Sequence, residues 1–168
     1  MDAARVLHLL AHLKTRDIEV WLDGGWAIDA LLEEQTRPHD DLDLVARLDD
    51  SAQIERALDE RGYVLVAGGP PASFELVDGD GHQVDVHPVS FTTTGHSVYR
   101  MANGEDWIYP ADAFSGLGRI LGDDVPCLTP EVVMISHTTG YTLDEAQRQD
   151  VTALGERYGI PLPDFPNA

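Results

Sequence analysis

The chain has one cysteine, few basic residues and no long apolar run. Since Cys127 has no second cysteine to pair with, no internal disulfide bond can form, and we expect a cytoplasmic location. No apolar stretch approaches the length of a membrane span, so we expect no membrane partner. Residues 1–13 carry Asp2, His8 and His12, and this pattern predicts an amphipathic helix and not a signal peptide.

Basic residues are scarce throughout the sequence. The 168 residues include 11 Lys and Arg against 30 Asp and Glu, which gives a formal net charge of −19. A field of this sign repels nucleic acid, and no cluster of basic side chains offers a local exception, so we expect no nucleic-acid partner. The same field attracts small cationic molecules. Alternatively, the acidic surface serves only solubility.

The most informative segment that is present combines a short strand, a glycine pair and a helix. Apolar residues at positions 18, 20 and 22 predict the strand, and residues 26–32 predict the helix. Because Gly24 and Gly25 lack a Cβ atom, the backbone there can bend sharply and bring its N–H groups close to phosphate oxygens. The N-terminus of the helix favours an anion at the same place. The segment therefore predicts a phosphate-binding turn.

Two carboxylates follow this turn. Asp41 and Asp43 alternate with Leu42 and Leu44, so in a strand both carboxylates lie on one face and both leucines face the core. Neighbouring carboxylates repel each other unless a cation lies between them, and Mg²⁺ commonly binds one or two carboxylates together with substrate phosphates. The polar face of an edge strand would give the same pattern. The glycine turn upstream favours the metal site.

Five segments carry a resemblance to a known family. They are residues 24–29 (GGWAID), 37–43 (RPHDDLD), 84–88 (VDVHP), 125–128 (VPCL) and 137–141 (HTTGY). On these residues, which span nearly the whole chain, the sequence resembles the small antibiotic nucleotidyltransferases of the DNA polymerase β superfamily. It is most similar to the lincosamide nucleotidyltransferases and then to the aminoglycoside 2″-nucleotidyltransferases. The gap between Gly25 and Asp41 is a few residues longer than in the general superfamily signature, and the small antibiotic subgroup shares it.

The resemblance implies a metal-dependent transfer of a nucleoside monophosphate to a hydroxyl of a small molecule, with release of pyrophosphate. AMP from ATP is the expected donor group, a lincosamide or aminoglycoside is the expected acceptor, and Mg²⁺, as two ions with the bound nucleotide, is the expected cofactor. Asp41, Asp43 and Asp85 are the implied metal ligands and catalytic residues, with Asp85 as third ligand or as general base on the hydroxyl. Taken alone, Asp85 is an ordinary residue on the polar face of a hairpin strand.

The other candidate residues surround these carboxylates. The expected nucleotide-binding residues are Gly24, Gly25, Trp26, Arg37 and His39, and the expected acceptor-pocket residues are His87, His137 and Tyr141. Arg37 is always charged and close to the acidic motif, which suits phosphate better than Arg100 or Arg119. His39 and His87 could orient a carboxylate, contact phosphate or make only structural hydrogen bonds, and Trp26 could equally be a core residue. Carboxylates expected only at helix ends, turns or the surface are Asp23, Asp29, Asp123 and Asp124.

Two alternative functions keep the same fold. One is a minimal nucleotidyltransferase that modifies a protein side chain, as antitoxin-type members do, although the chain has no long disordered or basic docking segment. The other is a catalytically silent nucleotide-binding module, against which the intact carboxylates at 41, 43 and 85 argue. Nothing in the sequence indicates an oligomeric state.

The expected fold is α+β (α/β-like), a nucleotidyltransferase fold in which a mixed β-sheet has flanking helices on one side and a helical C-terminal portion. Expected helices cover residues 1–13, 26–32, 51–61, 130–139 and 143–158. Expected strands cover residues 18–22, 41–44, 63–66, 74–77, 83–89, 97–101, 107–109, 118–121 and 125–128, with a hairpin turn at 78–81. We expect residues 1–90 to form the nucleotidyltransferase core and residues 91–168 to wall the acceptor pocket, within one compact unit.

Overall fold

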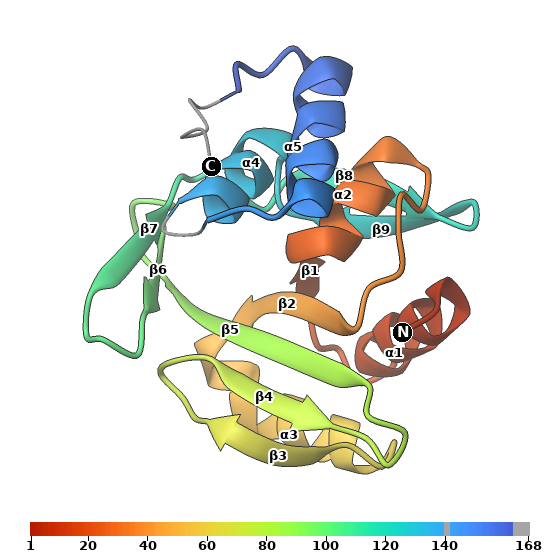
Figure 1. Cartoon of the computed structure of the whole chain (residues 1–168). Helices are drawn as coiled ribbons and strands as arrows, with labels where there is room; N and C mark the ends of the chain where they lie inside the picture. The colour runs from red at the N-terminus through yellow and green to blue at the C-terminus, as the bar shows by residue number, and fades with distance from the viewer. Residues whose placement is uncertain (140–141, 163–168) are drawn as a thin grey trace.

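A single mixed sheet organises the molecule. The computed structural model describes residues 1–139 and 142–162, and the nine strands found there join in the order β3-β4-β5-β2-β1-β9-β8, with β6 paired to the end of β5 and β7 to β6 (Figure 1). The strands are β1 (Val20–Leu22), β2 (Asp41–Arg47), β3 (Val64–Gly68), β4 (Phe74–Val77), β5 (Gln83–Phe91), β6 (Ser97–Arg100), β7 (Asp106–Tyr109), β8 (Gly116–Ile120) and β9 (Asp123–Cys127). The β2–β5 and β1–β9 pairs are parallel and the other pairs are antiparallel.

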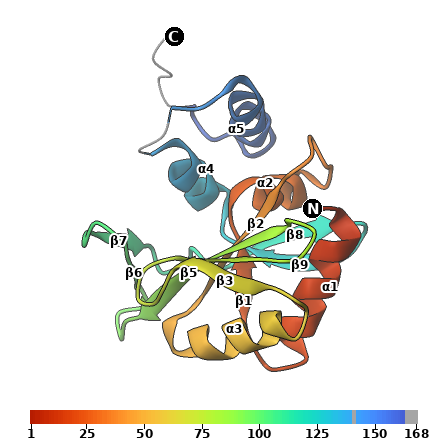
Figure 2. The same ribbon diagram turned by 60° about the horizontal axis from the view of Figure 1, so that its bottom comes forward.

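Helices cover both faces of this sheet, whereas the sequence predicted them on one side. They are α1 (Ala3–Lys14), α2 (Gly24–Leu32), α3 (Ser51–Asp59), α4 (Pro130–Thr138) and α5 (Glu145–Tyr158), with a short 3₁₀ turn at Leu48–Asp50. Figure 2 shows α1 and α3 against one face and α2, α4 and α5 on the other. None of the helices in the described part of the chain is long and apolar enough to cross a membrane.

Alternation along β2 and β5 fixes which side chains face the core. Leu42, Leu44, Val84 and Val86 are fully buried, while the residues between them are partly exposed or exposed. A strand presents successive side chains to opposite faces, so the polar residues at positions 41, 43 and 85 share the other face. The antiparallel hairpin of β4 and β5, predicted from the turn at 78–81, is confirmed.

The start of α2 differs from the prediction. The sequence suggested that this helix begins at residue 26, but it begins at Gly24 because Asp23 caps it. Asp23 Oδ1 accepts a hydrogen bond from the Gly24 backbone N–H at 2.8 Å. A side-chain oxygen in this position satisfies one of the backbone N–H groups that a helix leaves unpaired at its N-terminus. The glycine pair therefore forms the first turn of the helix.

The C-terminal half of the chain completes the same sheet. β9 pairs with β1 through Leu22 and Cys127, so strands from residues 1–90 and from residues 91–168 lie side by side. α5 also packs against α2, where Tyr158 Oη donates to the carbonyl oxygen of Leu31 at 2.9 Å. The helices of the second half therefore pack on α2.

Candidate functional site

Three carboxylates meet on two adjacent strands. In the parallel β2–β5 pair, Asp43 lies opposite Asp85, and Asp41 is two residues before Asp43 on the same face. One carboxylate oxygen from each of Asp41, Asp43 and Asp85 lies within 4.8 Å of the others. The structure therefore brings together the three residues that the sequence singled out for metal binding and catalysis.

Burial and mutual repulsion raise the pKa of the carboxylates at positions 41 and 85. Burial raises the pKa of Asp85 to about 6, with a further rise from Asp43 and an opposing effect of two 3.0 Å hydrogen bonds from Gln83. Burial and then the charge of Asp43 also raise the pKa of Asp41. A cation between these groups would reverse both shifts because it favours the ionised forms. Three oxygen donors at this spacing fit a hard divalent ion such as Mg²⁺.

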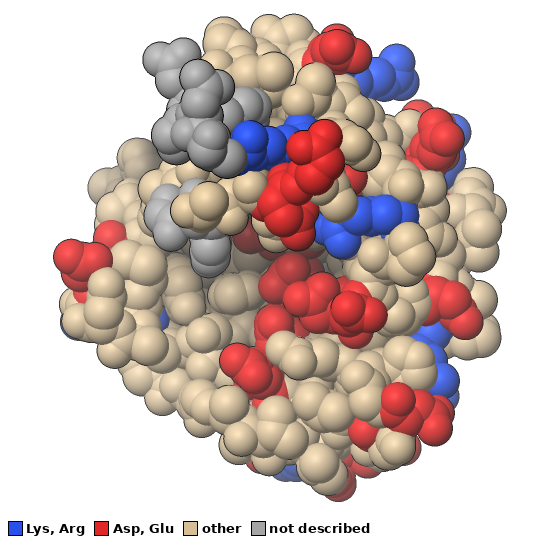
Figure 3. All heavy atoms as spheres, in the orientation of Figure 1, with Lys and Arg blue, Asp and Glu red and all other residues tan. Residues whose placement is uncertain are grey.

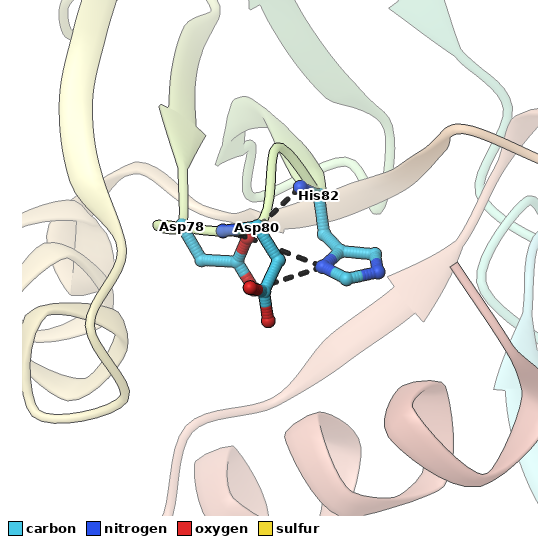
Figure 4. Close-up of side chains that lie close together, drawn as sticks. All are labelled: Asp78, Asp80 and His82. Atoms are coloured by element: carbon cyan, nitrogen blue, oxygen red, sulfur yellow. Dashed lines mark hydrogen bonds and ion pairs between the residues drawn. The ribbon is translucent and has the colours of Figure 1, made fainter.

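A second acidic cluster in the β4–β5 turn behaves differently. Asp78 Oδ1 accepts hydrogen bonds from the backbone N–H groups of Asp80 and His82, both at 2.9 Å, and the His82 ring lies beside the same carboxylate (Figure 4). Arg5 forms an ion pair with Asp78 at 2.5 Å. Burial would raise the pKa of Asp78, but the hydrogen bonds from His82 and Asp80 outweigh it and lower the pKa. The carboxylate is already satisfied, and we interpret this cluster as a turn-stabilising one.

His87 adds an imidazole next to the first cluster. Its Nε2 lies 3.4 Å from Asp43 Oδ1, and its ring packs edge-on against Tyr99 with centroids 5.5 Å apart. Burial alone would lower the pKa of His87, but the contact with Asp43 and the charges of Asp23 and Asp85 together raise it. The carboxylates around this imidazole therefore outweigh the effect of its burial.

The glycine pair allows two side chains to approach the start of α2. A Cβ atom on Gly24 would lie 1.9 Å from Asp43 Oδ2, and one on Gly25 would lie 2.3 Å from His39 Nδ1. Gly24 also has a φ of +62°, a conformation that other residues adopt at a cost. Besides forming a turn, the glycines thus allow the Asp43 carboxylate and the His39 imidazole to lie directly against the N-terminus of the helix.

A cavity of about 450 Å³ lies over this arrangement. Its lining residues come from the start of α2, the segment before β2, the β2–β5 pair, the β6–β7 hairpin and helices α4 and α5. Figure 3 shows acidic side chains around a hollow between the sheet and these helices. The cavity-lining residues are Asp23, Gly24, Gly25, Arg37, His39, Asp41, Asp43, Ser73, His87, Tyr99, Met101, Trp107, Tyr109, Ser136, His137, Thr139 and Gln147.

Some of the candidate nucleotide-binding residues line the cavity, and one, Trp26, does not. Arg37 and His39 line the cavity, with Arg37 Nε donating to Asp150 at 2.7 Å and His39 Nε2 lying 2.6 Å from Asp29 Oδ2. Trp26 is 2% exposed and packs in the core, with its ring 5.2 Å from that of His39. Trp26 therefore packs against His39 from the side of the core. Its surface is not open to the cavity.

The remaining candidates lie around the rim or elsewhere. His137 lines the cavity, and burial lowers its pKa despite the nearby charge of Asp23. Tyr141 lies outside the described residues. Arg100 and Arg119 are paired with Asp106 and Asp124 on the β6–β7 and β8–β9 hairpins, and neither lines the cavity.

Some site residues escaped the sequence analysis. Asp23 is at a helix end, as expected, but is only 8% exposed, lines the cavity and accepts from Ser136 Oγ at 3.0 Å. Burial and then Asp43 raise its pKa. Asp29 was expected at a helix end, a turn or the surface, and this is wrong because it is 3% exposed and contacts His39. A carboxylate within an otherwise apolar helix was the available signal for Asp29, because a charge is buried only with partners.

The chain is similar in sequence and in fold to known proteins. The sequence model of the aminoglycoside-2″-adenylyltransferase family matches residues 5–154. A lincosamide resistance protein from Staphylococcus haemolyticus is 28% identical over 149 residues, which is 89% of each chain. The crystal structure of a lincosamide antibiotic adenylyltransferase with bound lincomycin has a TM-score of 0.82 at 23% identity, covering 96% of this chain and 99% of that one. An aminoglycoside enzyme in complex with adenylyl-2″-tobramycin has a TM-score of 0.75 at 21% identity, covering 94% and 89%. These likenesses confirm the predicted nucleotidyltransferase fold.

Proposed function

This chain belongs to the aminoglycoside-2″-adenylyltransferase family, as the resemblance in its sequence predicted, and it is a nucleotidyltransferase. We propose that it transfers AMP from ATP to a hydroxyl of a lincosamide-type antibiotic. Pyrophosphate is the second product. The observation that carries this proposal is the cluster of Asp41, Asp43 and Asp85 beside the N-terminus of α2, because it offers a cation site next to an anion site. A cytoplasmic location, where ATP is abundant, is part of the proposal.

The three carboxylates have two roles in this proposal, metal binding and proton acceptance. Asp41 and Asp43 would hold Mg²⁺, expected as two ions with the bound nucleotide, and the metal would supply positive charge against the phosphates. The oxygen of the acceptor hydroxyl bonds to the α-phosphorus, and the bond from this phosphorus to the pyrophosphate leaving group breaks. Asp85 accepts the proton that the hydroxyl loses. Asp85 is placed for this role because it lies opposite Asp43 on the adjacent strand.

The start of α2, beside the carboxylates, suits the triphosphate. Gly24 and Gly25 line the cavity there, and the dipole of the helix adds partial positive charge. Arg37 and His39 flank this helix end and supply donors for phosphate oxygens. Catalysis then depends on holding the nucleotide in line with the hydroxyl, since positioning and charge neutralisation dominate such reactions.

The acceptor wall favours a lincosamide over an aminoglycoside. Tyr99, Trp107 and Tyr109 of the β6–β7 hairpin line the cavity, with His87 and His137 near them. Among its described lining residues, only Asp23, Asp41 and Asp43 are acidic, and the latter two are committed to the metal. A polycationic aminoglycoside needs several free carboxylates. A lincosamide carries one amine on an apolar ring system, and aromatic faces bind such a group.

Product analysis tests the choice of acceptor. The enzyme is incubated with ATP and Mg²⁺ and either lincomycin or tobramycin, and the products are identified by mass spectrometry. We expect an AMP adduct on lincomycin. An adduct on tobramycin alone would contradict the acceptor assignment, and AMP attached only to added protein would favour the protein-modifying alternative.

A further inference from the structure

A buried carboxylate on α5 holds the segment between α2 and β2. Asp150 has a side chain that is 3% exposed, and its Oδ2 accepts from Arg37 Nε at 2.7 Å. Its other oxygen, Oδ1, lies 2.9 Å from the hydroxyl of Thr36. More than 110 residues separate Asp150 from these partners, so the contact ties the C-terminal helix to the loop that carries Arg37.

The same loop is held from its other side by Asp29 of α2. Asp29 Oδ1 accepts from the Thr36 backbone N–H at 3.0 Å and lies 2.7 Å from the Thr36 hydroxyl. Asp29 Oδ2 contacts His39 Nε2 at 2.6 Å. The Thr36 hydroxyl therefore lies between two buried carboxylates, and one continuous network runs from Asp150 through Thr36 and Asp29 to His39.

This network fixes the orientation of the Arg37 guanidinium group. Asp150 binds Nε, and Nη1 contacts the Pro38 carbonyl oxygen at 3.3 Å. Within the described part of the chain, Nη2 has no hydrogen-bond partner, and the residue lines the cavity that holds the start of α2. A guanidinium group held at one edge can present its other edge to a phosphate, which a point charge such as an ammonium group cannot do.

We propose that Asp150 is a positioning residue for the nucleotide, because it holds Arg37 with one edge of the guanidinium group toward the triphosphate. The proposal rests on the proposed function, since it assumes that the cavity binds a nucleotide. α5 then belongs to the nucleotide half of the site, although the sequence analysis assigned the C-terminal half to the acceptor pocket. Thr36 and Asp29 complete the support by fixing the loop on both sides of Arg37.

Two physical effects of Asp150→Asn oppose each other, which makes the test decisive. Removing one negative charge near the cavity would by itself strengthen the binding of a polyanion. In the Asp150→Asn variant, however, the amide oxygen can still accept from Arg37 Nε while the amide N–H₂ donates to the Thr36 hydroxyl oxygen, so a neutral acceptor replaces the charged partner of Arg37. Arg37 is then held less firmly in its direction, and ordering it becomes a cost of binding the nucleotide.

The experiment measures binding and not turnover. Titration calorimetry with the α,β-methylene analogue of ATP and Mg²⁺ gives the dissociation constant without any acceptor. We expect Asp150→Asn to raise this constant by about 3- to 10-fold, the scale of ordering one long side chain. We expect no further rise when Asp150→Asn is added to Arg37→Gln, because the two residues act through the same contact.

Tyr158→Phe is the matched control. It removes a different hydrogen bond between α5 and α2, the one to Leu31, without touching the Arg37 loop. A rise in the dissociation constant for this variant as large as that for Asp150→Asn would mean that general loosening of α5 is responsible, and the proposal would be wrong. An unchanged or lower constant for a folded Asp150→Asn variant would also overturn it.

Arg37→Lys keeps the proposal testable if Asp150→Asn does not fold. A lysine keeps the charge and can pair with Asp150, but it cannot also reach a phosphate with a second edge, so we expect weakened binding. Wild-type affinity for this variant would contradict the proposal. Failure of the wild-type protein to bind the analogue would instead contradict the proposed function, and the two failures are therefore distinguishable.

Discussion

Asp43 and Asp85 lie opposite each other on the adjacent parallel strands β2 and β5, with Asp41 two residues before Asp43 on the same face. This pairing raises the pKa of Asp85, after the larger effect of burial. Without a cation the three carboxylates repel one another, so the sheet holds them in an arrangement that is unfavourable for the protein alone. A bound cation would relieve this repulsion, so the arrangement favours metal binding.

The first prediction concerns pH and the metal-free protein. The folded-state pKa of Asp85 is raised from 3.8 to about 6, so Asp85 stabilises the fold fully below pH 3.8 and this contribution is lost as the pH rises through 6. We therefore expect Asp85→Asn to raise the midpoint of thermal unfolding at pH 7.5 without metal, and to have no such advantage at pH 4. An equal shift at both pH values would contradict the assigned pKa.

The second prediction concerns the glycine turn. Gly24→Ala places a Cβ atom 1.9 Å from Asp43 Oδ2 at a φ of +62°, so either the carboxylate or the start of α2 must move. We expect a loss of about 1 to 3 kcal/mol in the free energy of unfolding and a loss of about 100-fold in kcat/KM. Denaturant titration and steady-state kinetics measure both quantities.

Gly79→Ala is the control for this change. Gly79 lies in the β4–β5 turn, and nothing lies within 4 Å of an added Cβ atom. We expect its effect on stability to stay within about 0.5 kcal/mol, with unchanged kinetics. Similar behaviour of the two alanine variants would show that contact with Asp43 does not constrain position 24.

The third prediction concerns the aromatic wall. Trp107→Ala removes a ring that lines the cavity, and we expect the KM for lincomycin to rise by about tenfold, the scale of a lost aromatic contact with its buried area. The KM for ATP should not change. Ile108→Ala is the matched control, because Ile108 is the next residue of β7, is 55% exposed and does not line the cavity. Equal changes in the two KM values for Trp107→Ala would contradict a role specific to the acceptor.

Local pattern was sufficient to predict only part of the carboxylate cluster. The alternation of Asp41 and Asp43 with buried leucines sets the polar face of β2, and the β4–β5 hairpin sets the polar face that carries Asp85. That Asp85 lies beside Asp43 depends on the parallel β2–β5 pairing, and its role in the site was expected from the family resemblance and not from its local pattern. The glycine pair could be located from local pattern, although its close contact with Asp43 depends on how α2 packs over the sheet.

Other parts of the site depend on contacts between distant residues. β9 pairs with β1 at Leu22 and Cys127, and Asp150 reaches Arg37 from α5, across more than 100 residues in each case. No local pattern encodes such partners. The β6–β7 hairpin consists of two short strands whose sequences were weak signals, so its aromatic residues could not be assigned to the cavity wall before the structure was known.

The most direct test of the central claim is pyrophosphate release from ATP and Mg²⁺, measured with and without lincomycin for the wild-type protein and for Asp43→Asn. We predict acceptor-dependent release by the wild type and a loss of at least about 100-fold in the variant, because the exchanged residue lies at the centre of the carboxylate cluster. Circular dichroism should show that the variant keeps its fold. Undiminished release by a folded Asp43→Asn variant would contradict the claim that these carboxylates carry the reaction.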